Sequence, residues 1–248
     1  MPPIFDDQYE KFTEACHKHG YVYEPFQQKT DDGWTLTVFH ITGYLDDPDG
    51  KKAGERKTKT EGKLPVLAIP GSFGDAQHWF ADAQGKPMHL QLYDAGYDIW
   101  MGNNRGTKYS NVSDKFPVND DSFERWDFSW AELGLYDGAA LISKIKEYTG
   151  QPKVNYIGYS MGTTQMFYGL THREEDFYAD NMNKFVALAP CIYFEHTEYD
   201  QYVNGYGEYR KLGINVLYGP NWDQHKKDIC ANMSSYWCND AKATNREP

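Results

Sequence analysis

The chain has 248 residues, enough to bury the core of one α/β domain. Its formal net charge of −11 argues against a nucleic-acid partner, because phosphates are bound by basic surfaces. No apolar run reaches the length of about 18 residues that a transmembrane segment needs, and the first residues lack the basic and apolar regions of a signal peptide. The length therefore allows one folded domain, or one domain and part of a second.

The first sixty residues predict a helix, a hairpin and a loop. Apolar residues recur at helical spacing over residues 5–19. Two β-rich runs follow, at residues 21–28 and 34–42, and the segment between them contains Asp-Asp-Gly, which is typical of a hairpin turn. Residues 43–63 are charged and contain glycine, as expected for an exposed loop.

The middle of the chain alternates apolar runs with helical patterns. The apolar runs predict buried strands, at residues 64–69, at 97–101, from Val154 to the glycine-rich motif described next, and at 184–190. One helical pattern ends at Gly96, one covers residues 133–148, and one extends through Leu170. This alternation predicts a mostly parallel sheet with crossover helices. Four polar and aromatic residues within and after the second run are expected to hold loop geometry: Asp98, Trp100, Asn103 and Arg105.

A Gly-x-Ser-x-Gly motif lies between the strand that begins at Val154 and the helix that follows it. In a nucleophile elbow of this kind, the serine occupies a strained turn and exposes its Oγ at the edge of the sheet. A Cβ at Gly158 or Gly162 would collide with the neighbouring strand or helix. A chain with 22 glycines can contain the motif by chance, but the strand before it and the helix after it favour Ser160 as a catalytic nucleophile.

Four further stretches resemble signatures of the acid lipases, a family that includes the gastric, lingual and lysosomal enzymes. They are residues 94–106, 126–137, 148–151 and 185–190. They occur in the family's order and at roughly its spacing, and the resemblance extends from about residue 21 to about residue 238. It implies an α/β-hydrolase fold with a helical cap, and hydrolysis of acylglycerols or sterol esters.

The resemblance also implies roles for individual residues. Ser160 takes the position of the nucleophile, and the N–H groups of Met161 and Ser72 take the two positions of the oxyanion hole. Two backbone donors there would stabilise the negative charge that develops on an attacked ester carbonyl. Cys230 and Cys238 resemble the cap cysteines, which form a disulfide in the family. No metal and no cofactor is expected.

The sequence departs from the family pattern at several places. Pro70 replaces the family's histidine before Gly71, and the family's G-H-S-Q-G contains Tyr159 and Met161 here. In this fold the acid and base of the triad follow on loops after two further strands. The resemblance stops inside the cap, so we expect the triad Asp and His to be absent from this chain. Without a base, Ser160 would remain a poor nucleophile.

The sequence thus predicts two parts and leaves two main functions open. Residues 1–190 are expected to form the N-terminal part of the hydrolase core, and residues 191–248 part of the cap. The first function is a triacylglycerol lipase or sterol esterase that forms an acyl-enzyme from a lipid ester at a lipid–water interface. The second is a non-catalytic, lipase-like protein that binds lipid or a partner, and an acyltransferase or thioesterase is a weaker third. The family suggests a secreted or lysosomal location, which the sequence leaves undecided.

Overall fold

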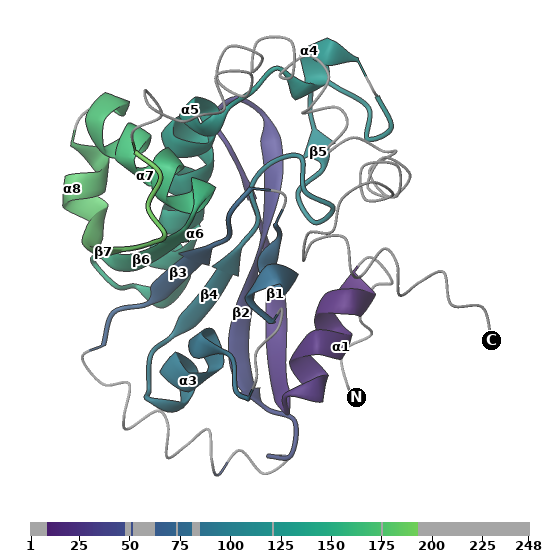
Figure 1. Cartoon of the computed structure of the whole chain (residues 1–248), viewed down its shortest axis with the longest axis vertical. Coiled ribbons are helices and arrows are strands. Elements are labelled where there is room, and N and C mark those ends of the chain that lie inside the picture. Colours follow the sequence, from purple (N-terminus) through teal and green to yellow (C-terminus); the bar gives the residue numbers. More distant parts are fainter. Residues whose placement is uncertain are drawn as a thin grey trace. The chain divides into compact units, whose positions relative to one another are not determined.

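The computed structural model describes residues 9–47, 51, 63–72, 74–80, 85–120, 122–174 and 176–192 (Figure 1). The described residues belong to two compact units, one with residues up to 114 together with 129–192, and one with residues 115–128. Of the predicted cap, residues 191–248, the part after residue 192, which includes Cys230 and Cys238, lies outside the described residues. The division into core and cap therefore stays a prediction.

The first unit is built on a mixed sheet. Along the sheet, the described strands are β1 (Tyr21–Lys29), β2 (Trp34–Tyr44), β4 (Ile99–Gly102), β3 (Val66–Ile69), β6 (Val154–Tyr159) and β7 (Met182–Leu188), with a short β5 (Val112–Ser113) beside β2. β1, β2 and β4 pair antiparallel, whereas β4, β3, β6 and β7 pair parallel. This sheet confirms the predicted hairpin and the predicted parallel strands.

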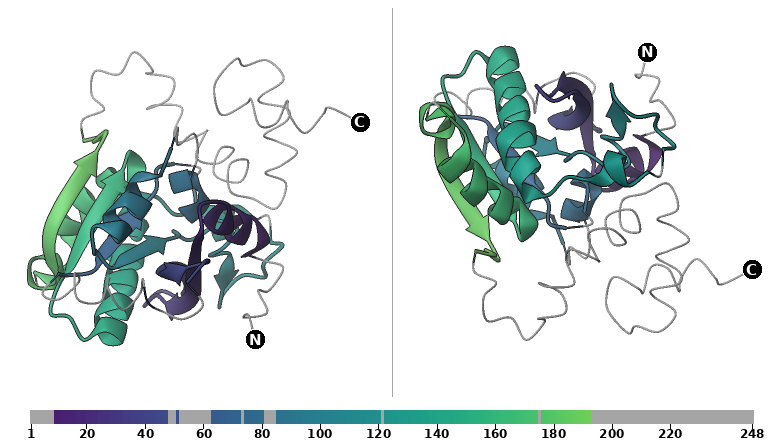
Figure 2. Two further views of the ribbon diagram at one scale, coloured as in Figure 1. Left: turned by 90° about the horizontal axis from the view of Figure 1, so that it is seen from below. Right: turned by 90° about the horizontal axis from the view of Figure 1, so that it is seen from above.

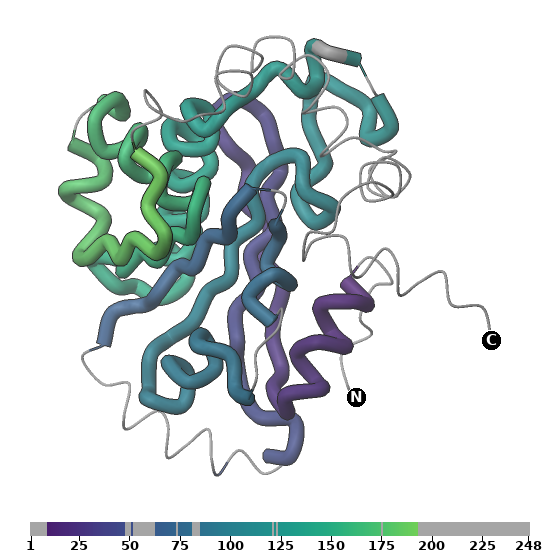
Figure 3. Tube along the Cα trace, in the orientation of Figure 1, coloured from purple at the N-terminus to yellow at the C-terminus, as the bar shows by residue number. Residues whose placement is uncertain are grey.

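Helices connect the strands, as the tube in Figure 3 shows. In the first unit they are α1 (Glu10–Lys18), the 3₁₀ helix η2 (Ala76–Phe80), α3 (Met88–Asp94), α5 (Trp130–Glu132), η3 (Leu133–Asp137), α6 (Gly138–Thr149), α7 (Met161–His172) and α8 (Phe177–Asn181); the second unit contains α4 (Phe123–Trp126).

Two predictions change in detail. The helix expected over residues 133–148 begins with a π-helical segment, η3, and the last predicted strand ends at Leu188 because Ala189 turns the backbone to a φ of +48°. Among the described helices, none is long and apolar enough to span a membrane.

Both faces of the sheet are covered. Because strand residues alternate between faces, Phe39 points toward α1, where its ring stacks on Phe12 at 4.0 Å. On the other face, Trp100 stacks on His40 at 4.0 Å and meets Tyr148 of α6 edge-on at 5.3 Å. Figure 2 accordingly shows α3 and α6 on opposite sides of the strands. The two apolar layers fix the sheet and leave the ends of its strands for the loops that carry polar residues.

One buried residue in the α3 layer is polar. His89 is 1% exposed, and neither of its ring nitrogens has a hydrogen-bond partner in the described part of the chain. The ring of Phe80 packs edge-on against it at 4.6 Å. Burial lowers the pKa of His89 to about 3, and the nearby His19 contributes in the same direction. The folded protein therefore keeps this imidazole neutral.

We expect acid to destabilise the fold through His89. In the unfolded chain its pKa returns to 6.5, so the unfolded state gains the proton first as pH falls. The contribution of the neutral His89 to the free energy of unfolding is fully present above pH 6.5. It declines as the pH falls toward 3, by up to about 1.4 kcal/mol per pH unit. Replacing His89 by Leu should remove this part of the slope, as measured by urea unfolding at about pH 7 and about pH 4.5.

His172→Gln provides the matched control, because it replaces a histidine at an exposed position of α7 instead of a buried one. A His89→Leu chain that loses as much stability as the wild type on acidification would contradict this account.

Candidate active site

Strand β6 ends in a sharp turn at Ser160. The backbone there has φ +50° and ψ −116°, a strained conformation for a residue with a side chain. The Ser160 N–H donates to the carbonyl of Leu188 at the end of β7, 2.9 Å away. Its carbonyl accepts the N–H of Thr163 at 2.8 Å. The turn is therefore held from two sides, by the neighbouring strand and by the first turn of α7.

The two glycines of the motif leave no room for side chains. A Cβ at Gly158 would lie 2.5 Å from the carbonyl oxygen of Gly162, and a Cβ at Gly162 would lie 2.6 Å from the carbonyl oxygen of Ile69. The buried hydroxyl of Tyr156 donates to the same Gly162 carbonyl at 2.8 Å. Helix α7 thus begins directly against the carboxyl end of β3, and this close approach forces the sharp turn at Ser160.

The loop after β3 approaches the serine. A Cβ built on Gly71 would lie 3.0 Å from the Cβ of Ser160. Ser72 is the next residue and is half-buried. Met161 is the first residue of α7, a position whose N–H has no acceptor within its own helix. The two expected oxyanion donors thus belong to the two backbone segments that flank Ser160, and their role stays a prediction.

Asn103, after β4, anchors the far end of this loop. Its Oδ1 accepts the N–H of Ala76, the first residue of η2, at 2.8 Å. Its Nδ2 donates to the carbonyl of Thr37 on β2, also at 2.8 Å. Asn103 is fully buried, so these bonds satisfy backbone groups that water does not reach. This contact supports the expectation that Asn103 holds loop geometry.

The guanidinium of Arg105 is buried among three segments. Its side chain is 1% exposed, its Nε donates to Asp137 Oδ1 at 2.8 Å, and its Nη2 donates to Asp32 Oδ1 at 2.8 Å. Asp137 ends η3, and Asp32 lies in the hairpin turn between β1 and β2. Partial burial alone would raise the pKa of Asp32, but hydrogen bonds from Arg105 and Thr30 lower it. Arg105 therefore joins segments distant in sequence, which is the structural role expected for it.

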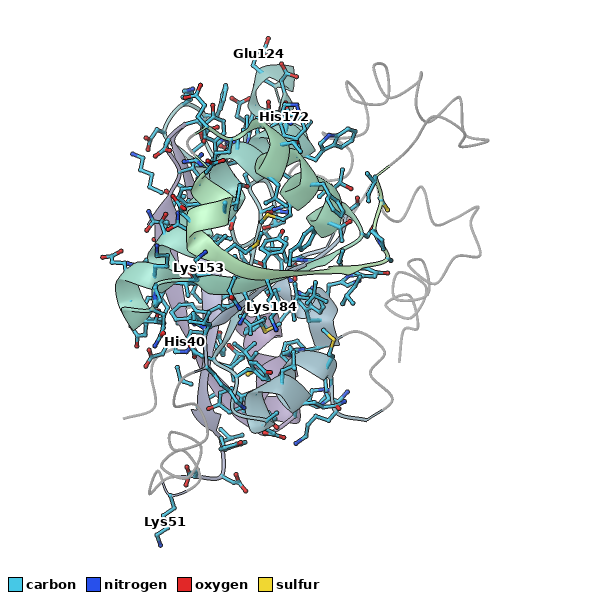
Figure 4. All side chains as sticks on the ribbon, turned by 90° about the vertical axis from the view of Figure 1, so that its left-hand side faces the viewer. His40, Lys51, Glu124, Lys153, His172 and Lys184 are labelled. Carbon is cyan, nitrogen blue, oxygen red and sulfur yellow. The ribbon has the colours of Figure 1, made fainter. Side chains whose placement is uncertain are left out.

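No Asp or His side chain forms a hydrogen bond with Ser160 in the residues that the structure describes. Its Oγ lies 4.0 Å from the thiol of Cys191. His172 lies at the other end of α7, where its ring stacks on Tyr168 at 4.0 Å (Figure 4). The structure therefore brings Ser160 together with Gly71 and Cys191, and it leaves the acid and base unassigned.

Sequence reasoning missed several polar contacts around the turn. The buried amides of Asn104 and Gln165 pair side by side, at 2.7 and 3.2 Å, and connect the loop after β4 to α7. The hydroxyls of Thr163 and Thr164 contact the backbone of Cys191. These pairs are separated by many residues in the sequence, and no local pattern indicates them.

Comparison with known proteins places the chain in a family. Residues 65–209 match the family of the alpha/beta hydrolase fold. This match covers more than half of the chain, which therefore belongs to the α/β-hydrolase fold family. The match confirms the predicted fold class.

Individual relatives are lipases and esterases. Lipase member M of Mus musculus is 35% identical over 179 residues, covering 72% of this chain and 39% of that protein. Gastric triacylglycerol lipase of Mus musculus is 36% identical over 180 residues, covering 72% of this chain and 42% of that protein. Sterol esterase 2 of Saccharomyces cerevisiae is 34% identical over 181 residues, covering 71% of this chain and 32% of that protein. These similarities confirm the resemblance to the acid lipases, and the chain spans less than half the length of each of these relatives.

Among solved structures, an esterase of Pyrococcus furiosus is similar with a TM-score of 0.47 and 14% identity. That similarity covers 92% of this chain and 66% of the esterase.

We expect Arg105→Gln to reduce the free energy of unfolding by about 3–5 kcal/mol, because it leaves the buried Asp137 carboxylate without its partner. Lys144→Gln is the control, since Lys144 pairs with the exposed Glu147 and such pairs contribute at most about 1 kcal/mol. Urea unfolding measures both values. Equal losses in the two variants would show that the Arg105 contacts contribute no more than a surface pair.

Proposed function

We propose that this chain carries the nucleophile and the oxyanion hole of a lipid ester hydrolase. The observation that supports the proposal is the strained backbone of Ser160, whose φ is +50°. Ser160 lies between β6 and α7, and the loop after β3 packs against it. Backbone strain of this kind persists only where the surrounding structure enforces it, and it is concentrated at functional sites. In a nucleophile elbow it directs the serine Oγ away from the strand and toward substrate.

The proposed reaction begins with attack of Ser160 Oγ on the ester carbonyl carbon. The carbonyl oxygen gains negative charge, and the N–H groups of Met161 and Ser72 donate to it. The C–O bond to the alcohol then breaks, the alcohol leaves with a proton, and an acyl-enzyme remains on Ser160. Water hydrolyses this ester in a second step and regenerates the hydroxyl.

A general base must remove the Ser160 proton, and an acid must orient that base. We assign both groups to positions outside this chain, because the family places them on loops after two further strands. Ser160 in the isolated chain is then a weak nucleophile with a high pKa, as for any hydroxyl without a base. The assignment predicts that an added base will restore part of its reactivity.

The names of the relatives guide the choice of substrate. One relative is named a triacylglycerol lipase and another a sterol esterase. Both names specify esters of lipids, so we infer that the substrate here is a lipid ester met at a lipid–water interface. The choice between acylglycerol and sterol ester stays open.

We expect imidazole to support acylation of Ser160 by a p-nitrophenyl ester of a fatty acid. Imidazole can act as the base that we assign to a position outside this chain, so the peptide containing Ser160 should gain the mass of the acyl group in proportion to the imidazole added. Peptide mass spectrometry measures this gain. Ser143→Ala is the matched control, because Ser143 is exposed on α6 and its loss should leave the label on Ser160 unchanged.

The same experiment separates the two functions. No acyl group on Ser160 at any imidazole concentration would contradict the hydrolase. Equal binding of lipid vesicles by the wild type and Ser160→Ala would then favour the lipid-binding alternative.

A further inference from the structure

The chain after β7 turns back toward Ser160. Ala189 has a φ of +48°, which is unusual for a residue with a side chain. Two residues later, the N–H of Cys191 donates to Thr163 Oγ1 at 3.1 Å, and the carbonyl of Cys191 accepts the hydroxyl of Thr164 at 2.8 Å. Both backbone groups of Cys191 are therefore bound by consecutive threonines in the first turn of α7.

The hydroxyl of Thr163 also contacts the serine. It donates to the carbonyl of Ser160 at 2.6 Å while it accepts the N–H of Cys191. A hydroxyl has one proton to donate, so Thr163 uses it on the strained serine and keeps a lone pair for Cys191. Thr163 is fully buried and Thr164 is 8% exposed, so water does not compete strongly for these bonds.

These bonds bring the Cys191 side chain next to the nucleophile. Its Sγ lies 4.0 Å from Ser160 Oγ and also donates to the carbonyl of Ala189 at 3.5 Å. A sulfur atom at this distance occupies one side of the hydroxyl. The groups bonded to a carbonyl carbon under attack by Ser160 must therefore fit beside the thiol of Cys191.

We propose that Thr163 and Thr164 are positioning residues that hold the segment 189–191 against the nucleophile, and that Cys191 limits the bulk of the ester beside its reacting carbonyl. The part concerning ester bulk rests on the proposed hydrolase function. The part concerning position does not, because it follows from hydrogen bonds within the chain. The two parts are tested separately.

The strain at Ala189 explains why the threonines are needed. A residue with a side chain is strained in this conformation, so the segment 189–191 would move away from the elbow without compensating bonds. The two hydroxyls supply these bonds. Removing either hydroxyl should release the segment while leaving the sheet and its apolar layers intact.

The position is tested by alkylation of Cys191 with iodoacetamide, followed by peptide mass spectrometry. Thr163→Val and Thr164→Val keep the side-chain shape but remove a hydroxyl, and we expect each to increase the rate at Cys191 by about fivefold, the factor that corresponds to one hydrogen bond. Thr163→Ser and Thr164→Ser keep the hydroxyl and should react like the wild type. Unchanged rates in both valine variants, or equal rates in the valine and serine variants, would overturn the proposal.

Cys16 is an internal control in the same samples. It is fully buried, and burial raises the pKa of its thiol to about 12, so it should react only when the whole unit unfolds. Should a valine variant also expose Cys16, amide hydrogen exchange of the wild type decides the matter. The Cys191 amide, which donates to Thr163, should then exchange much more slowly than an unstructured amide, and exchange at the unstructured rate would overturn the proposal.

The bulk of the ester is tested with the imidazole-assisted acylation of Ser160. An α-branched ester should acylate Ser160 more slowly than an acetate does. Cys191→Ala should increase the ratio of the two acylation rates, branched ester to acetate, whereas Cys191→Leu should decrease this ratio. A ratio that neither variant changes would overturn the role of Cys191. Complete absence of acylation would instead count against the hydrolase, while the alkylation result would still decide the role of the threonines.

Discussion

The structure around Ser160 depends on the contact between the start of α7 and the carboxyl ends of β3 and β6. At Gly158 and Gly162 this contact is between backbones, with no space for a Cβ on either residue. A helix that begins so close to two strands requires the chain to reverse within one residue, and Ser160 is that residue. Its strained φ is therefore a consequence of packing on both sides of the turn, which the rigid sheet does not allow to relax.

Polar side chains, rather than apolar packing, connect the loops to this turn. Loops carry backbone N–H and C=O groups that need partners when they are buried. Asn103 satisfies such groups on two segments, and Arg105 joins the hairpin to η3. Gly134 of η3 lies so close to α7 that a Cβ on it would collide with the carbonyl oxygen of Gln165. The loops around Ser160 are thus held by directional bonds, which fix orientation better than apolar contacts do.

The features that the sequence could predict are local. The apolar runs predict β3 and β4, the hairpin follows from Asp-Asp-Gly, and the elbow follows from two glycines whose role depends on their immediate neighbours. Contacts between distant residues could not be predicted. Asp32 and Arg105 are 73 positions apart, and Ser160 and Cys191 are 31 apart, so their meeting depends on strand order and register. The π-helical start of the helix before β6 packs against α7, and the pattern of a single helix does not contain that contact.

The register of β6 and β7 explains why two strained residues occur side by side. Tyr159 pairs with Leu188, so the next residues, Ser160 and Ala189, leave the sheet at the same level. Because β6 and β7 are parallel, both strands end at the same edge of the sheet. At that edge α7 occupies the space above β6. The chain after β7 must reverse as well if it is to stay beside the serine, and Ala189 makes that reversal with a φ of +48°. One parallel pair therefore produces both the turn that carries Ser160 and the segment that places Cys191 beside its hydroxyl.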